Sequence, residues 1–248
     1  MMAPVRTLLD EQFAPITSSI GYLELSLDEV AAGLETWRRS LYETVGVTRL
    51  RESLPHLFRR LEPLTSGVRP RELLVNAGRW TAYFDNSLRG TDAVSAIGYL
   101  SRSLKCQGLA ITTVPHTIGL PGVRQGRAGA IQFELFGPLP TQFLNYVRSV
   151  EVAFDGERWT FGTSGTEQAF EETEAYRARR VRDRFNSEML ERYCQALGLD
   201  VFNEDAYGPE AVFFESMMPM PAEGIIMTLD EAQEWLEIAP GAARRLPG

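Results

Sequence analysis

The sequence predicts an α+β fold in which a mainly antiparallel sheet of five or more strands is covered by helices at residues 28–42, 92–104 and 173–197. Two observations lead to this prediction. Residues 79–136 read as a strand, a helix and two further strands in succession. An Asp-Gly pair later in the chain separates two alternating segments, which is typical of a β-hairpin. Hairpin-connected strands together with helices indicate an α+β domain.

The clearest strand spans residues 79–86, and its apolar residues alternate with less apolar ones. The apolar face consists of Trp80, Ala82 and Phe84. Asp85 and Asn86 end the strand, because their side chains hydrogen-bond readily to the backbone of a turn. A helix with one apolar stripe follows from Thr91 or Asp92 to about Leu104. Strands are predicted next at residues 109–114 and 130–136.

A strand and two helices precede this segment. Residues 16–25 alternate as a strand. Ser26 and Glu29 then form a capping box, which opens the helix at residues 28–42. A shorter helix begins after Ser53, with a proline in the first turn, where proline is tolerated.

The Asp155-Gly156 pair predicts a hairpin with a two-residue loop. In that register the cross-strand pairs are Phe154 with Glu157, Val152 with Trp159, and Val150 with Phe161. A long helix at residues 173–197 should follow, ended by Gly198. Its first half carries the arginines Arg177, Arg179, Arg180, Arg182 and Arg184, which we interpret as a solvated helix face with ion pairs one turn apart.

The chain divides most readily at about residues 203–210. We expect residues 1–204 to form one α+β domain and residues 205–248 to form a C-terminal tail that packs on it. A second capping box, Thr228 with Glu231, predicts one short helix within the tail.

A glycine-rich segment at residues 117–129 carries Arg124 and Arg127. It has two interpretations. It lacks the spacing and the Lys-Ser/Thr ending of a P-loop, so a long connection between two strands is the favoured one. The alternative is a loop whose backbone cradles an anion.

Composition restricts the possible partners. A net charge of −8 argues against nucleic acid and suits a basic protein partner. No apolar run is long enough for a membrane span and the N-terminus lacks a signal peptide, so we expect a cytoplasmic protein that does not bind membranes. The two cysteines, Cys106 and Cys194, are interpreted as buried thiols, and the two histidines are too few and too far apart for a zinc site. We expect no metal and no cofactor.

Candidate catalytic groups are sparse. The Gly162–Gly165 segment lacks the spacing of a nucleophile elbow. Cys106 and His116 lie at opposite ends of a predicted strand, roughly 30 Å apart if it is continuous, so they cannot form a dyad. His56 is interpreted as a solvated helix residue. Trp37, Trp80 and Trp159 are interpreted as core aromatics, with ligand stacking as the alternative.

The order of these elements resembles a group of known proteins. In order, these are the pattern W-x-x-Y-F-D-N, a helix ending in Leu100, Ser101 and Leu104, two strands, and a D-G hairpin with a tryptophan. In this order the chain resembles small bacterial immunity proteins of polymorphic toxin systems. The similarity covers residues 73–172. It implies an acidic, cytoplasmic, non-catalytic protein that binds and blocks a toxin domain.

Three functional hypotheses follow. The first is a protein-binding role of the immunity type, acting through the residues Asp85, Asn86, Arg89 and Asp92. The second is an enzyme that acts on a small anionic molecule with carboxylates and arginines near residues 85–92. The third is a structural subunit of a larger assembly, with the tail as its docking arm. We favour the first and expect no catalytic residue.

Overall fold

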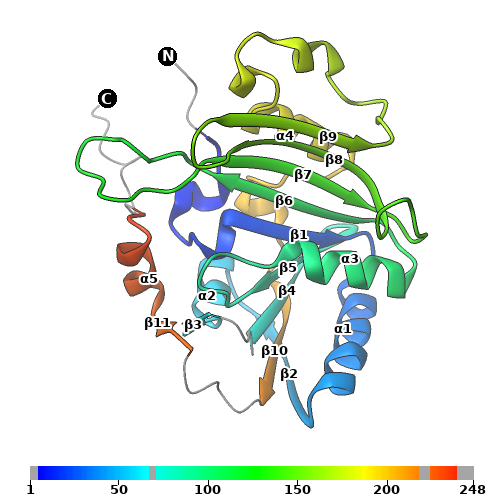
Figure 1. The fold of residues 1–248 in the computed structure, drawn as a ribbon. Coiled ribbons are helices and arrows are strands. Elements are labelled where there is room, and N and C mark those ends of the chain that lie inside the picture. The colour runs from blue at the N-terminus through cyan, green and yellow to red at the C-terminus, as the bar shows by residue number, and fades with distance from the viewer. Residues whose placement is uncertain (1–4, 67–70, 218–223, 239–248) are drawn as a thin grey trace.

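The computed structural model describes residues 5–66, 71–217 and 224–238 (Figure 1). They form a nine-stranded antiparallel sheet in the order β2-β10-β4-β5-β1-β6-β7-β8-β9. This confirms the predicted fold class. The sheet strands are β1 (Ser19–Leu23), β2 (Thr44–Arg51), β4 (Arg71–Ala77), β5 (Trp80–Asp85), β6 (Gly108–Val114), β7 (Ala130–Phe136), β8 (Tyr146–Phe154), β9 (Trp159–Gly165) and β10 (Glu210–Met217). A separate ribbon pairs β3 (Leu64–Thr65) with β11 (Ile226–Met227).

The helices divide between the two faces of the sheet. They are α1 (Leu27–Leu41), α2 (Leu54–Arg59), α3 (Ala93–Leu104), α4 (Ser187–Ala196) and α5 (Leu229–Trp235). Short 3₁₀ turns occur at Leu8–Glu11, Ile16–Ser18, Thr173–Arg177, Val181–Asp183 and Glu204–Ala206. Helices α1 and α3 lie together on one face, and the other helices pack with the N-terminal segment on the opposite face (Figure 1).

Strand β5 separates the two cores, as its alternation predicts. Trp80 and Phe84 belong to the core under α2 and α4, whereas Tyr83 belongs to the core under α1 and α3. The second core depends on a close approach of α3 to β1. A Cβ atom added at Gly21 would lie only 2.5 Å from Ile97 Cγ1, so a larger residue there would push the helix away.

Most elements of the N-terminal half follow the sequence. The Ser26–Glu29 capping box is present, with both reciprocal hydrogen bonds. Ser53 precedes α2 as expected, but its hydroxyl pairs with His56 Nδ1 at 2.7 Å and caps no backbone amide. His56 is exposed, as predicted. Strands β2 and β4 were not predicted from the sequence.

The segment assigned to a tail contributes to the sheet itself. The predicted short helix is α5, and its Thr228–Glu231 capping box is formed. Strand β10 was not predicted from the sequence, and it pairs with β2 on one side and β4 on the other. Val212 and Phe214 point into the core under α1. A deletion of residues 205–248 would therefore remove an interior strand and could not test a docking arm cleanly.

The predicted helix at residues 173–197 is wrong over its first half. The helix begins only at Ser187, because the Asn186 side chain accepts the backbone N–H groups of Glu188 at 3.1 Å and Met189 at 3.0 Å. It ends as predicted, with Gly198 in the left-handed region at a φ of +76°. Arg180 is extended, and Arg184 donates from Nε to the Ala178 carbonyl at 2.9 Å.

A buried ion pair fixes this non-helical segment to the sheet. Arg148 on β8 donates to both carboxylate oxygens of Glu171, at 2.8 Å from Nε and 2.6 Å from Nη2. Both side chains are buried. The Tyr176 hydroxyl also donates to Glu171, at 2.8 Å, and pairs with the Tyr193 hydroxyl of α4 at 2.9 Å. The network therefore joins β8, the 171–176 segment and α4.

The β8–β9 hairpin is present, but its predicted register is wrong by two residues. Phe154 pairs with Trp159 and Val152 pairs with Phe161, so the loop has four residues, 155–158. The Asp155 carboxylate accepts the N–H groups of Glu157 and Arg158, each at 2.9 Å, which stabilises the longer turn. A shift of two residues leaves every side chain on its predicted face. Residues 162–165 continue β9.

The Glu171→Gln variant should lower the free energy of unfolding by about 3–5 kcal/mol, because it leaves a buried guanidinium without its anion. The matched control is Glu172→Gln, whose pair with Arg192 is exposed and should contribute about 0–1 kcal/mol. Urea unfolding of both variants measures the difference. Equal losses would show that the Arg148–Glu171 pair does not fix the segment.

Candidate functional site

The structure places two of the four predicted binding residues inside the protein. Asp85 is 1% exposed, and its carboxylate accepts the backbone N–H groups of Ser87 at 2.9 Å and Asp92 at 3.0 Å. Asn86 is fully buried and donates to the Pro63 carbonyl at 2.8 Å. Both side chains shape the turn after β5, in accord with the turn chemistry that the sequence predicts.

The other two residues lie nearer the surface. Asp92 is half-buried and caps α3, where its carboxylate accepts the N–H of Ser95 at 3.3 Å. Arg89 is exposed. The four residues are therefore close along one loop, but Asp85 and Asn86 do not present side chains to a partner. Their role in binding stays a prediction.

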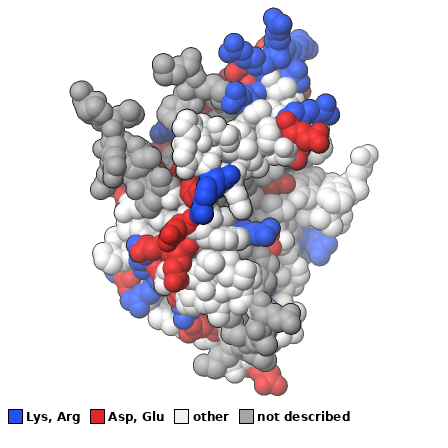
Figure 2. All heavy atoms as spheres, turned by 60° about the vertical axis from the view of Figure 1, so that its left-hand side comes forward, with Lys and Arg blue, Asp and Glu red and all other residues white. Residues whose placement is uncertain are grey.

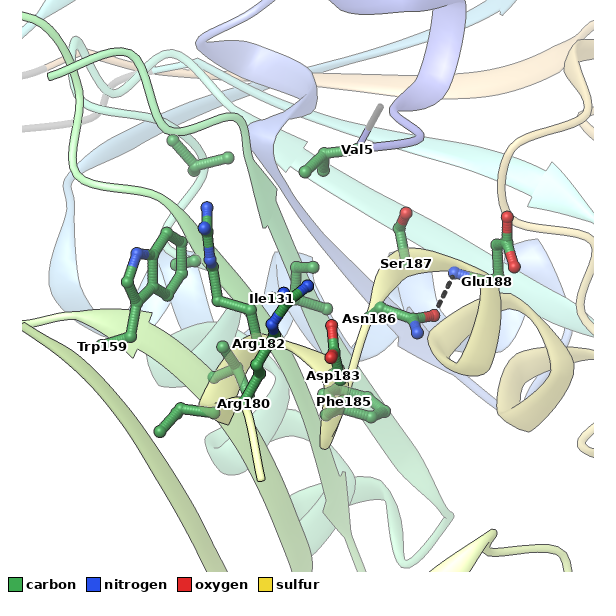
Figure 3. Close-up of a pocket in the computed structure, with 14 residues that line it drawn as sticks. Val5, Ile131, Trp159, Arg180, Arg182, Asp183, Phe185, Asn186, Ser187 and Glu188 are labelled. Atoms are coloured by element: carbon green, nitrogen blue, oxygen red, sulfur yellow. Dashed lines mark hydrogen bonds between the residues drawn. The ribbon is translucent and has the colours of Figure 1, made fainter. Parts of the chain in front are cut away.

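A pocket lies elsewhere in the molecule, between the sheet and the segment that leads into α4. Its volume is about 810 Å³, within the range of pockets that hold small organic molecules. The wall opposite the sheet is the segment 180–188, which lies in the chain between Tyr176 and Tyr193, two members of the Arg148–Glu171 network. Figure 3 shows this wall together with Trp159, Ile131 and Val5.

The floor of the pocket is apolar because strand residues of one face converge there. Ile131 of β7 pairs with Val152 of β8, and both face the pocket. Phe185 closes the floor from the α4 side, and Val5 contributes from the N-terminal segment. Trp159 is half-buried at the start of β9 and forms one side. The alternative interpretation of Trp159 as a ligand-stacking residue therefore has a structural basis, whereas Trp80 is a core aromatic as predicted.

The rim carries charged residues of both signs. They are Arg180, Arg182, Asp183 and Glu188, and all are exposed. Over the ranges that the structure describes, none of the four has an ion-pair partner. The guanidinium carbon of Arg182 lies 5.2 Å from the centre of the Trp159 ring, a cation–π contact. This site was not predicted, because the arginines were expected on one continuous helix, whereas α4 begins only at Ser187.

Figure 2 shows where the positive charge of this region gathers. Arginines form a group at the upper end of the molecule, where Figure 1 places the segment that links β9 to α4. The exposed arginines of that segment include Arg179, Arg180 and Arg182. Acidic residues lie in the same segment, so this end carries charges of both signs.

Groups suited to catalysis do not converge in the pocket. His116 lies behind Trp159, with ring centres 5.1 Å apart, and its Nδ1 accepts the Gly129 N–H at 3.2 Å. Burial and the nearby Arg182 lower the pKa of His116. Burial raises the pKa of Cys106 to about 11, and Cys194 is also buried with a raised pKa, as expected for inert thiols. Among the described residues no His, Cys, Asp and Glu cluster could hold a metal ion.

The 117–129 segment is both a connection between two strands and a loop whose backbone binds an anion. It connects β6 to β7, and it binds an anion from its own chain. The Glu237 carboxylate, just after α5, accepts the backbone N–H groups of Arg124 at 3.0 Å and of Gln125 and Gly126 at 2.8 Å. These amides lower the pKa of Glu237 to about 2. Gly126 has a φ of +71°, and a Cβ there would lie 2.7 Å from the Ile118 nitrogen.

A second polar surface lies on the opposite face of the sheet, over β7 and β8. Gln132 donates to Glu151 at 3.0 Å, and Glu134 lies on the same face beside Tyr146. Burial, and then the neighbouring Glu151 carboxylate, raises the pKa of Glu134 to about 7. Burial and Glu134 raise the pKa of Tyr146 to about 12, with a smaller effect from Asp92. The predicted residue Asp92 thus borders an acidic surface.

Comparison with known proteins found no similar protein. The chain matches no protein-family model, no curated protein and no solved structure. The resemblance to immunity proteins therefore stays a hypothesis. No helix among the described residues is long and apolar enough to span a bilayer.

The Glu134→Gln variant should change how stability depends on pH. A glutamate whose pKa rises from 4.5 in the unfolded chain to about 7 in the folded protein takes up a proton on folding, so the wild-type protein loses stability as pH rises through this window. The variant lacks that loss and should be the more stable protein above pH 7. Urea unfolding at a series of pH values measures the difference in the free energy of unfolding between the variant and the wild-type protein. The exposed Glu167→Gln variant is the control, and it should keep the wild-type pH dependence.

Proposed function

We propose that this protein is a non-catalytic binding protein whose pocket between the sheet and the 180–188 segment takes a small organic molecule with an apolar body. The observation that carries the proposal is the 810 Å³ hollow itself, with its floor of Ile131, Val152 and Phe185. Pockets of this size and lining are the default binding sites of proteins, because they remove most of a ligand's apolar surface from water.

Binding is favoured over chemistry by the groups that line the pocket. The Ser187 hydroxyl accepts the Arg6 N–H at 3.0 Å, and no imidazole lies beside it in the described lining. A nucleophile needs a base within hydrogen-bond reach. The charged residues of the rim are exposed, so water competes for their charges. The alternative of an enzyme acting on a small anion, with its site near residues 85–92, stays a second-ranked hypothesis.

The neutral fluorophore N-phenyl-1-naphthylamine tests the proposal. It should bind at one saturable site, with energy transfer from Trp159, which forms one side of the pocket. The Trp159→Ala variant should weaken binding about tenfold, because it removes an aromatic surface from the site. Fluorescence titration gives the affinities.

Trp235→Ala is the matched control. Trp235 is exposed on α5 and does not line this pocket, so its removal should leave the affinity unchanged. Circular dichroism checks that both variants fold. An absence of saturable binding, or equal effects of the two tryptophan variants, would overturn the proposal.

A second candidate is the immunity-type protein binding that the resemblance implies. One observation favours it. The β7–β8 loop exposes three large apolar side chains, Leu139, Phe143 and Leu144, which are 72%, 68% and 59% exposed. The loop is held by Asn145, whose amide donates to the Gly137 carbonyl at 2.8 Å and to Ser101 Oγ at 2.9 Å. Exposed apolar groups on a well-anchored loop are typical of protein interfaces. The net charge of −8 suits a basic partner.

The Asp92→Asn variant tests this second candidate, because asparagine caps a helix about as well as aspartate but carries no charge. Affinity capture from the native cell lysate should retain a basic protein at one-to-one stoichiometry. The variant should weaken that complex by roughly threefold to tenfold, as expected for a partly exposed ion pair at an interface. Asp205→Asn, an exposed residue elsewhere, is the control. Unchanged affinity of the Asp92 variant would remove Asp92 from the interface.

A further inference from the structure

We infer that a second copy of this chain pairs with the outer edge of β2, so that two nine-stranded sheets join across a two-fold axis. Strand β2 is an outer strand of the sheet, and Figure 1 shows it next to β10 at the lower margin. The proposed pocket is lined by strands β6 to β9 and so lies toward the opposite end of the sheet. The inference is therefore independent of the proposed function.

The outer edge of β2 presents backbone groups with which no described strand pairs. The inner edge pairs with β10 along its whole length. Just beyond the strand, the Glu52 N–H donates to the opposing Pro209 carbonyl at 3.0 Å, so the even-numbered residues of β2 direct their backbone groups toward β10. The residues that direct their N–H and C=O groups outward are therefore Val45, Val47, Arg49 and Arg51.

The common protections of an outer strand are absent from β2. Outer strands often carry prolines, lysines or β-bulges, which hinder pairing with a further strand. Residues 44–51 include no proline or lysine, and their pairing with β10 has no register shift. Arg49 pairs with Asp28 at 2.8 Å, and Arg51 pairs with Glu210 at 2.7 Å. Since both arginines are partly compensated within the chain, their charge does not prevent another strand from approaching.

An exposed apolar side chain lies at the middle of this edge. Val45 belongs to the core under α1, so the odd-numbered residues of β2 lie on the α1 face of the sheet. Val47 is on this face and is 38% exposed. A two-fold axis perpendicular to the sheet keeps the α1 faces of both copies on the same side. An axis at Val47 therefore removes this side chain from water by packing it against its own counterpart.

The charges of the edge select one register. In a symmetric antiparallel pair the overlap of residues 44–51 is longest when the axis passes through Val47 or Thr48. With the axis at Val47, Glu43 opposes Arg51 of the second copy, and the same pair recurs on the other side of the axis. With the axis at Thr48, no acid opposes a base. The register centred on Val47 is therefore the electrostatically favoured one.

The groups that this register brings together are suited to one another. Glu43 is exposed, and among the described residues it has no ion-pair partner. Arg51 is also exposed, and a guanidinium has five N–H groups, so it can bind a second carboxylate besides Glu210. The backbone fits as well, because Val47 opposes its counterpart and Arg49 opposes Val45, all with outward N–H and C=O groups.

The mass of the native chain in solution tests the inference. Sedimentation equilibrium should show the mass rising with concentration from 27.8 kDa toward twice that value. The series should extend to roughly 0.5 mM, which would populate even a weak specific dimer. A mass that stays at 27.8 kDa throughout would overturn the inference.

Amide hydrogen exchange identifies the edge that pairs. The outward amides of Val47 and Arg49 should exchange more slowly at high concentration than at low concentration, because the second copy accepts their hydrogen bonds. The Thr48 amide faces β10 and should be protected to the same degree at both concentrations, so it is the internal control. A dimer without slower exchange at Val47 would mean that another surface pairs.

The Val47→Lys variant should weaken dimerisation at least about tenfold, because it opposes two like charges at the axis. Val47 is exposed, so the single chain should fold normally, as circular dichroism checks. The matched control is Thr163→Lys, an exposed position on β9, the other outer strand. It should leave dimerisation unchanged. Equal effects of the two variants would contradict the assignment to β2.

Two charge reversals test the register. Glu43→Arg opposes arginine to arginine on both sides of the axis, and Arg51→Glu opposes glutamate to glutamate. Each variant alone should dimerise about tenfold more weakly than the native chain. An equimolar mixture of the two opposes arginine to glutamate on both sides and should recover the native affinity as a heterodimer. A mixture that associates no better than its components would overturn this pairing.

Discussion

The buried pair of Arg148 and Glu171 is the interaction on which the candidate site depends. It is bidentate, and Tyr176 and Tyr193 extend it to α4. A buried ion pair contributes little net stability, because both charges lose their hydration, but it permits few alternative conformations. The segment from residue 166 to residue 186 has no long helix or strand of its own. The pair therefore determines where this segment crosses the sheet, and so where the pocket has its second wall.

The two faces of the sheet serve different purposes. One face is covered along its length by helices, the N-terminal segment and the 180–188 wall, and the proposed pocket lies at its edge under β7, β8 and β9. On the other face α1 and α3 leave part of β7 and β8 uncovered, where Glu134 lies near Glu151 and Tyr146. The two proposed roles, small-molecule binding and protein binding, thus involve different surfaces. The two roles are compatible within one molecule, and neither obstructs the other.

Local sequence patterns predicted individual helices and strands better than they predicted which residues and elements lie side by side in the fold. The capping boxes before α1 and α5 are formed because their hydrogen bonds lie within four residues. The β8–β9 register was wrong because Asp155 stabilises a four-residue turn that the Asp-Gly rule does not consider. The long helix predicted at residues 173–197 was wrong over its first half. Phe185, Met189 and Tyr193 are core residues at helical spacing, but the chain before Asn186 is not helical and is attached to the sheet by the Arg148–Glu171 ion pair. Of the predicted binding residues, Asp85 and Asn86 have the turn roles that their chemistry favours, and this buries them.

The sequence by itself determined the fold class, the central strand, the helices with local caps, the buried cysteines and the faces of the hairpin. Each depends on periodicity, local hydrogen bonds or composition. Only the tertiary structure decided that β10 enters the sheet between β2 and β4, that Glu237 occupies the 117–129 loop, and that Arg180, Arg182 and Asp183 surround a pocket. These features join residues far apart in the chain. Their free energy comes from contacts that exist only after folding, so no local pattern records them.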